Sequence, residues 1–350
     1  MWQERRSSAW TAEQLERGGF TVSAVDGLPT AFVARAGSGP LRVAVCAEYD
    51  ALPGVGHACG HNVIAASAVG AGLALAEVAD DADITVTVFG TPAEEGGGGK
   101  IAMLDRGLFD GQHLAMMVHP AAFDDPAPGM IAAQHVRFRF TGKEAHAAAA
   151  PEEGVNAADA VTVGQVGIGL LRQHIRRTDM VHGIVTNGGD AANIVPGHTE
   201  AVYIVRSRVL EDLQALLPRV IRCYEAGALA TGATLSVEQD LAYAEVRTDP
   251  DLAAIWRRNA AAIGRQIEPP EALAGRFAAS TDFGNVSRRM PAIHALVGIE
   301  ANGASNHQPA FAAACASASA DQAVVDGAVL LAWTALDVAA DDALRERVMA

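Results

Sequence analysis

Residues 41–61, LRVAVCAEYDALPGVGHACGH, decide the fold. The apolar run Leu41 to Tyr49 predicts a strand buried on both faces, and the polar, glycine-containing stretch after it predicts a loop at the strand's carboxyl end. Further buried strands are predicted at 84–89, 114–118 and 293–299, with helices at 10–18, 64–78, 100–105, 250–263 and 321–335. This alternation indicates an α/β fold whose parallel sheet is covered by helices on both sides.

The pattern changes after residue 129. Residues 134–140, QHVRFRF, alternate apolar and polar side chains, which is typical of a strand with one exposed face. A second such strand is predicted at 201–205, and helices are predicted at 156–171 and 210–226. We therefore predict an α/β domain formed by residues 1–129 and 242–350, interrupted by an inserted α+β domain at 130–241.

Composition excludes several classes of protein. The 350 residues include 26 Lys and Arg against 41 Asp and Glu, a net charge of −15, and half of them are hydrophobic. The apolar fraction is too high for a disordered chain, and the acidic pI near 5.1 argues against a nucleic-acid partner, because phosphate contacts need clustered Lys and Arg. The apolar stretches, such as Val63 to Leu75, fall short of the roughly 20 residues that cross a bilayer. Without a signal peptide or regularly spaced cysteines, we expect a cytoplasmic protein.

Two metal-binding residue types follow the first strand. Cys59 and His61 are separated by Gly60, which lets the backbone turn so that both side chains face one point. They lie at the sheet edge where open α/β folds place ligands, and thiolate and imidazole both bind Zn²⁺ and similar ions. Taken alone, the pair fits a small buried cysteine beside an ordinary histidine equally well.

A pair of carboxylates follows the second strand, in GTPAEEGGGG at 90–99. Glu94 and Glu95 repel each other unless a cation lies nearby or one of them holds a proton. One could bind a metal while the other acts as general base on water activated by that metal. A phosphate loop is excluded because no Lys-Ser/Thr pair follows the glycines and the carboxylates would repel phosphate.

Two histidines complete the predicted site. His119 ends the third strand, and His307 follows the late strand at 293–299. Each of them alone fits a structural histidine. Together with Cys59, His61 and Glu95 they form five donors on one rim of the sheet, which suits a two-metal site with open positions for water.

These motifs resemble one metallohydrolase family. HACGH at 57–61, PAEEGGGG at 92–99 and the two later histidines occur in the order of the family that contains aminoacylases, glutamate carboxypeptidases and dipeptidases. The sequence is most similar to the amidohydrolase branch, with indole-acetyl-amino acid hydrolases, aminobenzoyl-glutamate hydrolases and Xaa-Arg-type dipeptidases. STDFGNVS at 280–287 resembles the last two groups most. The resemblance covers nearly the whole chain and implies hydrolysis of an amide bond in an N-acyl amino acid or dipeptide.

The resemblance also implies a role for each residue of the metal site. Two divalent metal ions, Zn²⁺ or Mn²⁺ and alternatively Ni²⁺ or Co²⁺, would be bound by Cys59, His61, Glu95, His119 and His307. Glu94 would be the catalytic carboxylate and general base, and Asp50 would orient a ligand from behind.

For the inserted domain, the resemblance implies a lid that also forms a homodimer contact. His146 would reach the partner's site and stabilise the oxyanion, while Asn193 and Arg206 would hold the substrate's carboxylate or carbonyl. The expected partners are therefore a small-molecule substrate and a second copy of the chain, with no membrane or nucleic acid.

Two alternatives remain open from the residues. In a thiol hydrolase, Cys59 would be the nucleophile and His57 or His61 its base, and such an enzyme would survive metal removal. A catalytically silent binding protein of the same fold is the other alternative, although a binder has no need for Glu94.

Overall fold

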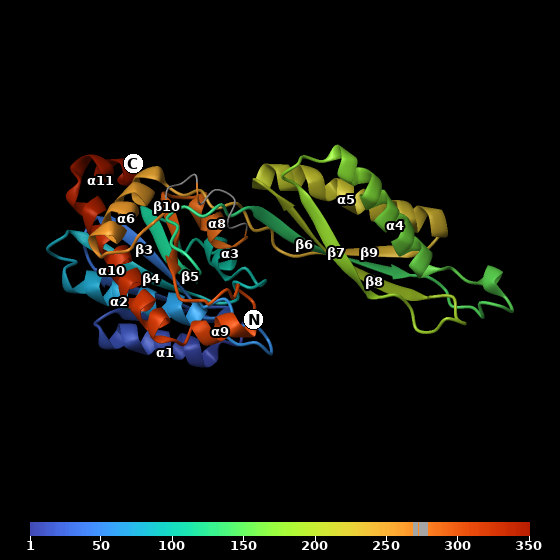
Figure 1. Ribbon diagram of the computed structural model, residues 1–350, viewed down its shortest axis with the longest axis horizontal. Helices are drawn as coiled ribbons and strands as arrows, with labels where there is room; N and C mark the ends of the chain where they lie inside the picture. Colours follow the sequence, from blue (N-terminus) through green and yellow to red (C-terminus); the bar gives the residue numbers. More distant parts are fainter. Residues whose placement is uncertain (269–271, 273–278) are drawn as a thin grey trace. The chain divides into compact units, whose positions relative to one another are not determined.

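The computed structural model describes residues 1–268, 272 and 279–350. The chain divides into two compact units, one formed by residues 1–130 and 246–350 and the other by residues 131–245 (Figure 1). The predicted insert, 130–241, begins one residue before the start of the second unit and ends four residues before the end of that unit.

The first unit is built on a six-stranded sheet in the order β1-β2-β4-β3-β5-β10. The predicted parallel strands are β3 (Leu41–Glu48), β4 (Ile84–Thr91), β5 (Leu114–Ala121) and β10 (Ala292–Gly298). Parallel pairing joins β4 to β3, β3 to β5 and β5 to β10, so this part of the fold prediction is confirmed.

An antiparallel hairpin, which was not predicted from the sequence, extends this sheet at one edge. Its strands are β1 (Thr21–Val25) and β2 (Leu28–Gly37), and β2 also pairs antiparallel with β4. The sheet is therefore mostly rather than wholly parallel. Asp26-Gly27, with Gly27 at φ 71°, is the turn pair typical of such hairpins and the signal that could have predicted it.

Helices cover the sheet of the first unit. They are α1 (Arg5–Arg17), α2 (His61–Glu77), α3 (Gly99–Leu104), α6 (Pro250–Ala262), α8 (Phe283–Ser287), α9 (Pro309–Ala314), α10 (Ala318–Ala340) and α11 (Asp342–Met349). The main core lies between the sheet and α2, α6 and α10, and it contains the fully buried Val45, Val88 and Leu330. The short helices α8, α9 and α11 were not predicted from the sequence.

Helix α10 differs from the expectation that no apolar segment is long enough to cross a membrane. Ala318–Ala340 has 23 residues and, by length and composition alone, is long and apolar enough to cross a membrane. It packs against α2, however, and half of its most apolar window is buried within the structure. These contacts are those of a core helix, and they explain its apolar sequence without a membrane.

The second unit is a four-stranded antiparallel sheet in the order β7-β8-β6-β9. Its elements are β6 (Ala132–Thr141), α4 (Ala157–Leu171), β7 (Met180–Asn187), β8 (His198–Ser207), α5 (Leu210–Thr231) and β9 (Thr234–Gln239), with 3₁₀ turns at Pro151–Glu153 and Arg172–His174. Both helices pack on the sheet, around the stacked rings of Phe138 and Tyr224. The unpredicted strands, β7 and β9, are the edge strands of this sheet. Strand β7 is mostly exposed and shows little alternation, whereas β9 is short, with half-buried Leu235 and Val237 alternating with exposed residues.

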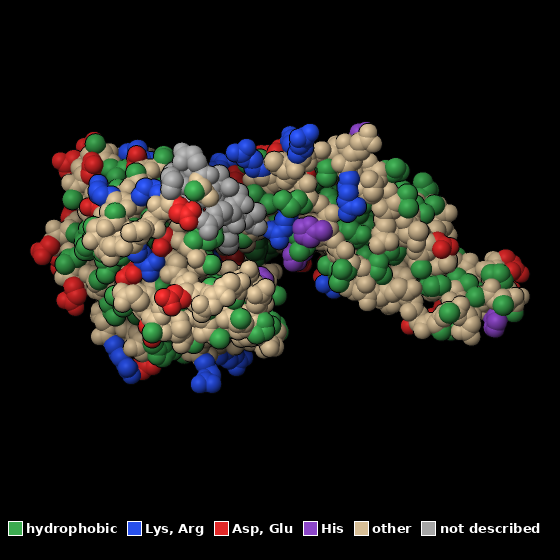
Figure 2. All heavy atoms as spheres, in the orientation of Figure 1, with side chains coloured by type: hydrophobic (Ala, Val, Ile, Leu, Met, Phe, Trp, Pro, Cys, Tyr) green, Lys and Arg blue, Asp and Glu red, His purple; other side chains and the backbone are tan. Residues whose placement is uncertain are grey.

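The surface of the first unit mixes both signs of charge. Figure 2 shows acidic and basic side chains interspersed over the face that carries α10 and α11. Among the described residues of that face, no continuous basic stripe is present of the kind that a phosphate backbone requires.

Candidate metal centre

Several side chains able to bind or support a metal lie at or just after the carboxyl ends of the parallel strands of the first unit. Glu48 ends β3, with Asp50 two residues later, whereas Glu94 and Glu95 follow β4 and His119 lies near the end of β5. Since the carboxyl ends of parallel strands meet at one edge of the sheet, these side chains converge there. The structure brings them together within one buried region of the first unit.

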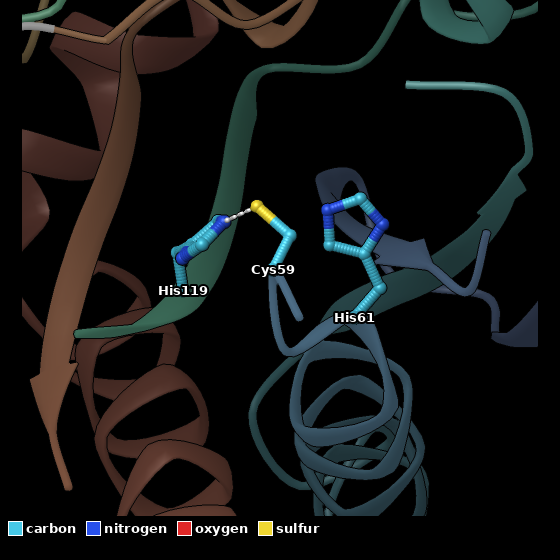
Figure 3. A group of neighbouring side chains, drawn as sticks. All are labelled: Cys59, His61 and His119. Atoms are coloured by element: carbon cyan, nitrogen blue, oxygen red, sulfur yellow. Dashed lines mark hydrogen bonds between the residues drawn. The ribbon is translucent and has the colours of Figure 1, made fainter. Parts of the chain in front are cut away.

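Gly60 controls how Cys59 and His61 are presented. It precedes α2 with φ 82°, the left-handed region that favours glycine. A Cβ at this position would lie 2.3 Å from Cγ of Pro120, so the close approach of the two segments also requires glycine. The tight turn allows Cys59, in the loop, and His61, at the start of α2, to face the same region as His119 (Figure 3).

A first cluster of donors consists of Cys59, His61 and His119. Their ligand atoms all lie within 4.8 Å of one another, and Cys59 Sγ is 3.4 Å from His119 Nε2 (Figure 3). His61 is fully buried and His119 is 8% exposed, so bulk water has little access to this cluster. One sulfur and two nitrogens form a donor set that suits Zn²⁺ and neighbouring transition metals.

A second cluster consists of Cys59, Glu95 and His307, again with ligand atoms within 4.8 Å of one another. His307 Nε2 lies 3.6 Å from Glu95 Oε2. The backbone of His307 has φ 70°, and its N–H donates to the carbonyl of Ala58 at 2.8 Å, which ties this late loop to the neighbour of Cys59. Because Cys59 belongs to both clusters, one thiolate could bridge two ions.

Asp50 contacts one residue of each cluster and orients it. Its Oδ1 lies 3.0 Å from His61 Nδ1, and its Oδ2 accepts a hydrogen bond from the Glu95 backbone N–H at 3.1 Å. Burial would raise the pKa of Asp50, but these hydrogen bonds lower that pKa to about 2. With Nδ1 held by a carboxylate, His61 presents Nε2 to the cluster, the arrangement common behind metal-binding histidines.

Glu94 lies beside these clusters without belonging to either of them. It is 8% exposed, and its Oε2 is 3.9 Å from His61 Nε2. Burial, and then the negative charge of Glu48, raise the pKa of Glu94 well above the usual carboxyl range. A neighbouring cation would favour the ionised carboxylate, which is the form that accepts a proton.

Buried polar atoms test whether the residues fit a metal. Glu48 Oε2, His61 Nε2 and Glu95 Oε1 are buried and have no hydrogen-bond partner among the described residues. Burial of such atoms without a partner costs free energy, and native proteins rarely leave them so. Cations held by the two clusters would satisfy these atoms, so the donor set fits a pair of divalent ions.

Four further buried residues beside the clusters were not among the predicted site residues. Lys100 Nζ donates to Glu48 Oε1 at 2.5 Å and to Asp282 Oδ1 at 2.6 Å, and all three side chains are at most 1% exposed. The signal in the sequence is Glu48 itself, a charged residue that ends an apolar strand. The fourth residue, His294, is buried in β10, and its ring centroid lies 5.7 Å from that of His119.

The structure gives little support to a metal-free thiol mechanism. Burial raises the pKa of Cys59 to about 12, so its thiol stays protonated without a cation. Of the two predicted bases, His61 uses Nδ1 for Asp50, and His57 Nδ1 has no hydrogen-bond partner among the described residues. His119 Nε2 lies 3.4 Å from the sulfur, and His61 is also close to it.

The remaining predicted residues belong to the second unit. His146 Nδ1 accepts the backbone N–H groups of Ala148 and Ala149 at 3.2 and 3.1 Å, so a neutral His146 carries its proton on Nε2. Asn193 is exposed, and its backbone carbonyl accepts the N–H of Ala147 at 3.0 Å. Arg206 lies on β8, where burial lowers its pKa. Their roles at the metal centre stay predictions.

Comparison with known proteins places the chain. Residues 44–330 match the model of peptidase family M20/M25/M40. The chain is 40% identical over 334 residues to a mouse (Mus musculus) Xaa-Arg dipeptidase, covering 92% of this chain and 77% of that protein. It is 36% identical over 263 residues to one of the polypeptides of p-aminobenzoyl-glutamate hydrolase from Escherichia coli, covering 67% and 54% of the two chains.

A solved structure shares the fold. A Bacillus subtilis protein described as a dinuclear metal binding peptidase from the M20 family superposes with a TM-score of 0.71 at 22% identity, covering 96% of this chain and 92% of that one. The resemblance stated from the sequence motifs is thereby confirmed. The chain belongs to peptidase family M20/M25/M40 and is a metal-dependent hydrolase.

Proposed function

We propose that this enzyme hydrolyses the amide bond of a dipeptide or an N-acyl amino acid. The observation that carries the proposal is the pair of donor clusters that share Cys59, with the buried Glu94 next to them. The names of its relatives support the same substrate classes, since one is a dipeptidase acting on Xaa-Arg and another hydrolyses aminobenzoyl-glutamate.

Two divalent metal ions are the proposed cofactors. Cys59, His61 and His119 would hold one of them, and Cys59, Glu95 and His307 the other. When bound, such ions polarise a carbonyl oxygen and lower the pKa of water. Zn²⁺ or Mn²⁺ is the proposed native ion, with Ni²⁺ and Co²⁺ as alternatives, because mixed S, N and O donors accept all four.

Glu94 moves the proton in the proposed reaction. Its carboxylate takes a proton from the attacking water as the water oxygen bonds to the amide carbon. When the C–N bond breaks, Glu94 gives this proton to the leaving nitrogen, which departs as an amine. Low exposure keeps Glu94 away from bulk water, so the proton stays available for the second step.

Residues of the second unit would bind the substrate. The Nε2–H of neutral His146 is a hydrogen-bond donor that, in the proposed homodimer, would reach the site of the second copy and suit the negative charge that develops on the carbonyl oxygen there. Arg206 and Asn193 would hold the carboxylate or carbonyl of the substrate, because a guanidinium binds a carboxylate through two parallel hydrogen bonds.

A homodimer formed through the second unit is part of the proposal. Strand β7 is an edge strand whose residues are mostly exposed, including Ile184 at 65%. Val166 and Leu170 of α4 are also exposed, and Figure 2 shows hydrophobic side chains over α4 and α5. An open strand edge with apolar neighbours favours pairing with another chain. Light scattering should give twice the monomer mass, and a monomer at micromolar concentration would contradict the dimer.

We also propose that the enzyme works in the cytoplasm. Its four cysteines are all free in the structure, which suits a reducing compartment.

The test of the proposed function is metal removal followed by reconstitution. The chelated enzyme should lose hydrolysis of N-acyl amino acids, aminobenzoyl-glutamate and basic dipeptides, and Zn²⁺, Mn²⁺ or Co²⁺ should restore it. A protein shown to be metal-free by elemental analysis that still hydrolyses these amides at the full rate would contradict the proposal. That outcome would favour the thiol mechanism, and alkylation of Cys59 would then abolish the activity.

A further inference from the structure

The carboxyl end of β3 carries a buried charge to which the proposed mechanism gives no role. The Glu48 side chain is 1% exposed, and its two oxygens differ in their surroundings. Oε1 accepts a hydrogen bond from Lys100 Nζ at 2.5 Å. Oε2 has no hydrogen-bond partner among the described residues and lies 3.5 Å from His61 Nε2. The carboxylate therefore has one satisfied oxygen and one oxygen directed at a predicted metal ligand.

Lys100 fixes this orientation. It is fully buried in the first turn of α3, directly after the four glycines, and its Nζ also donates to Asp282 Oδ1 at 2.6 Å. The backbone N–H of Lys100 donates to the other oxygen of Asp282 at 2.8 Å. Because Glu48, Lys100 and Asp282 come from three separate segments, this ion cluster holds the carboxylate of Glu48 in place relative to His61.

Charge and geometry both indicate a cation at Glu48 Oε2. Glu48 and Asp282 together carry two negative charges against the single positive charge of Lys100. The ligand atoms of Glu48, His61 and Glu94 lie within 4.8 Å of one another, and His61 also belongs to the cluster with Cys59 and His119. A carboxylate that binds a metal through one oxygen commonly has its other oxygen hydrogen-bonded, as Lys100 provides here.

We propose that Glu48, through Oε2, is a fourth protein ligand for the ion held by Cys59, His61 and His119, and that Lys100 is its positioning residue. This inference rests on the proposed metal-dependent function. It also gives the two ions different numbers of protein ligands. An ion with four protein ligands has a closed coordination shell, whereas the cluster of Cys59, Glu95 and His307 supplies three and leaves a position for water or substrate.

The variant Glu48→Gln tests the proposal. Its amide oxygen should stay with Lys100, since an amide NH₂ facing an ammonium group would set donor against donor. The NH₂ group then faces His61 and cannot bind a cation. We expect one of two Zn²⁺ ions to bind about tenfold more weakly or worse in calorimetric titration of the metal-free protein. The visible spectrum of the Co²⁺-loaded variant should also change, because it reports coordination number.

Two more variants sharpen the test. Lys100→Met should weaken the same ion, since Glu48 loses its fixed orientation. Glu245→Gln is the matched control, because Glu245 is 6% exposed and accepts the Leu210 N–H at 2.9 Å in the second unit. This control should bind both ions as the unmodified enzyme does. If Glu48→Gln does not unfold cooperatively, Glu48→Asp replaces it, since that variant keeps the charge but withdraws it from His61 by one methylene.

The outcomes distinguish this inference from the proposed function. An unmodified protein that binds no ions would overturn both. An unmodified protein that binds two ions, together with a folded Glu48→Gln variant of unchanged Zn²⁺ affinities and unchanged Co²⁺ spectrum, would overturn the role of Glu48 alone. In that case the Glu48–Lys100–Asp282 cluster would be structural.

Discussion

The Oδ1 atom of Asp50 lies 3.0 Å from Nδ1 of His61, and this contact determines which ring nitrogen faces the donor clusters. The other oxygen of Asp50 holds the Glu95 backbone at 3.1 Å. One buried carboxylate thus orients a residue of each cluster. The placement of both depends on a side chain that would bind no metal itself.

Asp50→Asn should therefore weaken metal binding. The amide keeps the shape of the side chain but removes its charge, and its NH₂ group would face either His61 Nδ1–H or the Glu95 N–H. We expect a loss of about 10- to 100-fold in metal affinity, measured by competition with a coloured chelator. Asp249→Asn, far along the chain and at the start of α6, is the control and should leave the affinity unchanged. Equal affinities in the two variants would remove Asp50 from its supporting role.

Glu94→Gln should retain metal and lose turnover. The amide cannot accept the proton from water, so kcat should fall by about 10²- to 10⁴-fold, the usual contribution of a general base. Elemental analysis should still find two ions per chain. A metal-replete variant that turns over at the normal rate would show that another group takes the proton.

Cys59→Ser should lower the metal content of both clusters, since Cys59 is their common member. A serine hydroxyl is a weaker ligand for the proposed ions than a thiolate. Elemental analysis after dialysis should find fewer than two ions per chain, and the sulfur-to-metal absorption of the Co²⁺ form should disappear. Full occupancy in this variant would exclude Cys59 from the ligand set.

Gly60→Ala should destabilise the first unit for two separable reasons. A residue with a Cβ at φ 82° costs about 1–2 kcal/mol, and this Cβ would also lie 2.3 Å from Pro120 Cγ. Gly54→Ala is the matched control, because Gly54 has φ 75° but no atom within 4 Å of the added Cβ. Thermal unfolding should show a larger fall in Tm for Gly60→Ala, and equal falls would mean that the contact with Pro120 relaxes freely.

The ion pair of Asp249 and Arg347 should make the free energy of unfolding depend on pH. Asp249 caps α6 and accepts two hydrogen bonds from Arg347 of α11, at 2.8 and 2.9 Å. Burial would raise the pKa of Asp249, but these bonds lower it below its ordinary value. The stabilisation is therefore present above the unfolded pKa of about 3.9 and is lost as pH falls through the lower folded value.

The variant Asp249→Asn measures how much this ion pair contributes to stability. Because Arg347 is 42% exposed, loss of its ion pair with Asp249 should lower the free energy of unfolding by only about 1 kcal/mol or less at neutral pH. The difference in the free energy of unfolding between the two proteins, measured by denaturant titration, should shrink toward zero below about pH 4. A difference that is the same in neutral and in strongly acidic buffer would show that the ionised form of Asp249 contributes nothing.

The predicted metal residues of the first unit could be found from the sequence because of a simple topological rule. Cys59 and Glu95 follow mostly apolar strands and His119 lies near the end of a third, and parallel strands place such positions on one edge of the sheet. Strands β6 and β8 of the second unit were predicted because their apolar and polar side chains alternate. Edge strand β7 was not predicted because its residues are mostly exposed on both faces, and edge strand β9 alternates over only six residues.

The other features of the site depend on contacts between distant segments. Glu48 accepts a hydrogen bond from Lys100, which lies 52 residues later, and no local pattern in the sequence relates these two residues. The membership of Cys59 in both donor clusters requires the loop that carries His307 to return to Ala58 through a backbone hydrogen bond. Such pairings become visible only when the chain is folded.

The most direct test of the account is a diffraction experiment on crystals of the metal-loaded enzyme, with data collected on both sides of the absorption edge of the bound metal. Two donor clusters that share Cys59 should give two anomalous peaks per chain in the first unit, with the sulfur of Cys59 bound to both of them. Crystals grown with excess metal that show no peak at Cys59, or a single peak that Cys59 does not touch, would contradict the account.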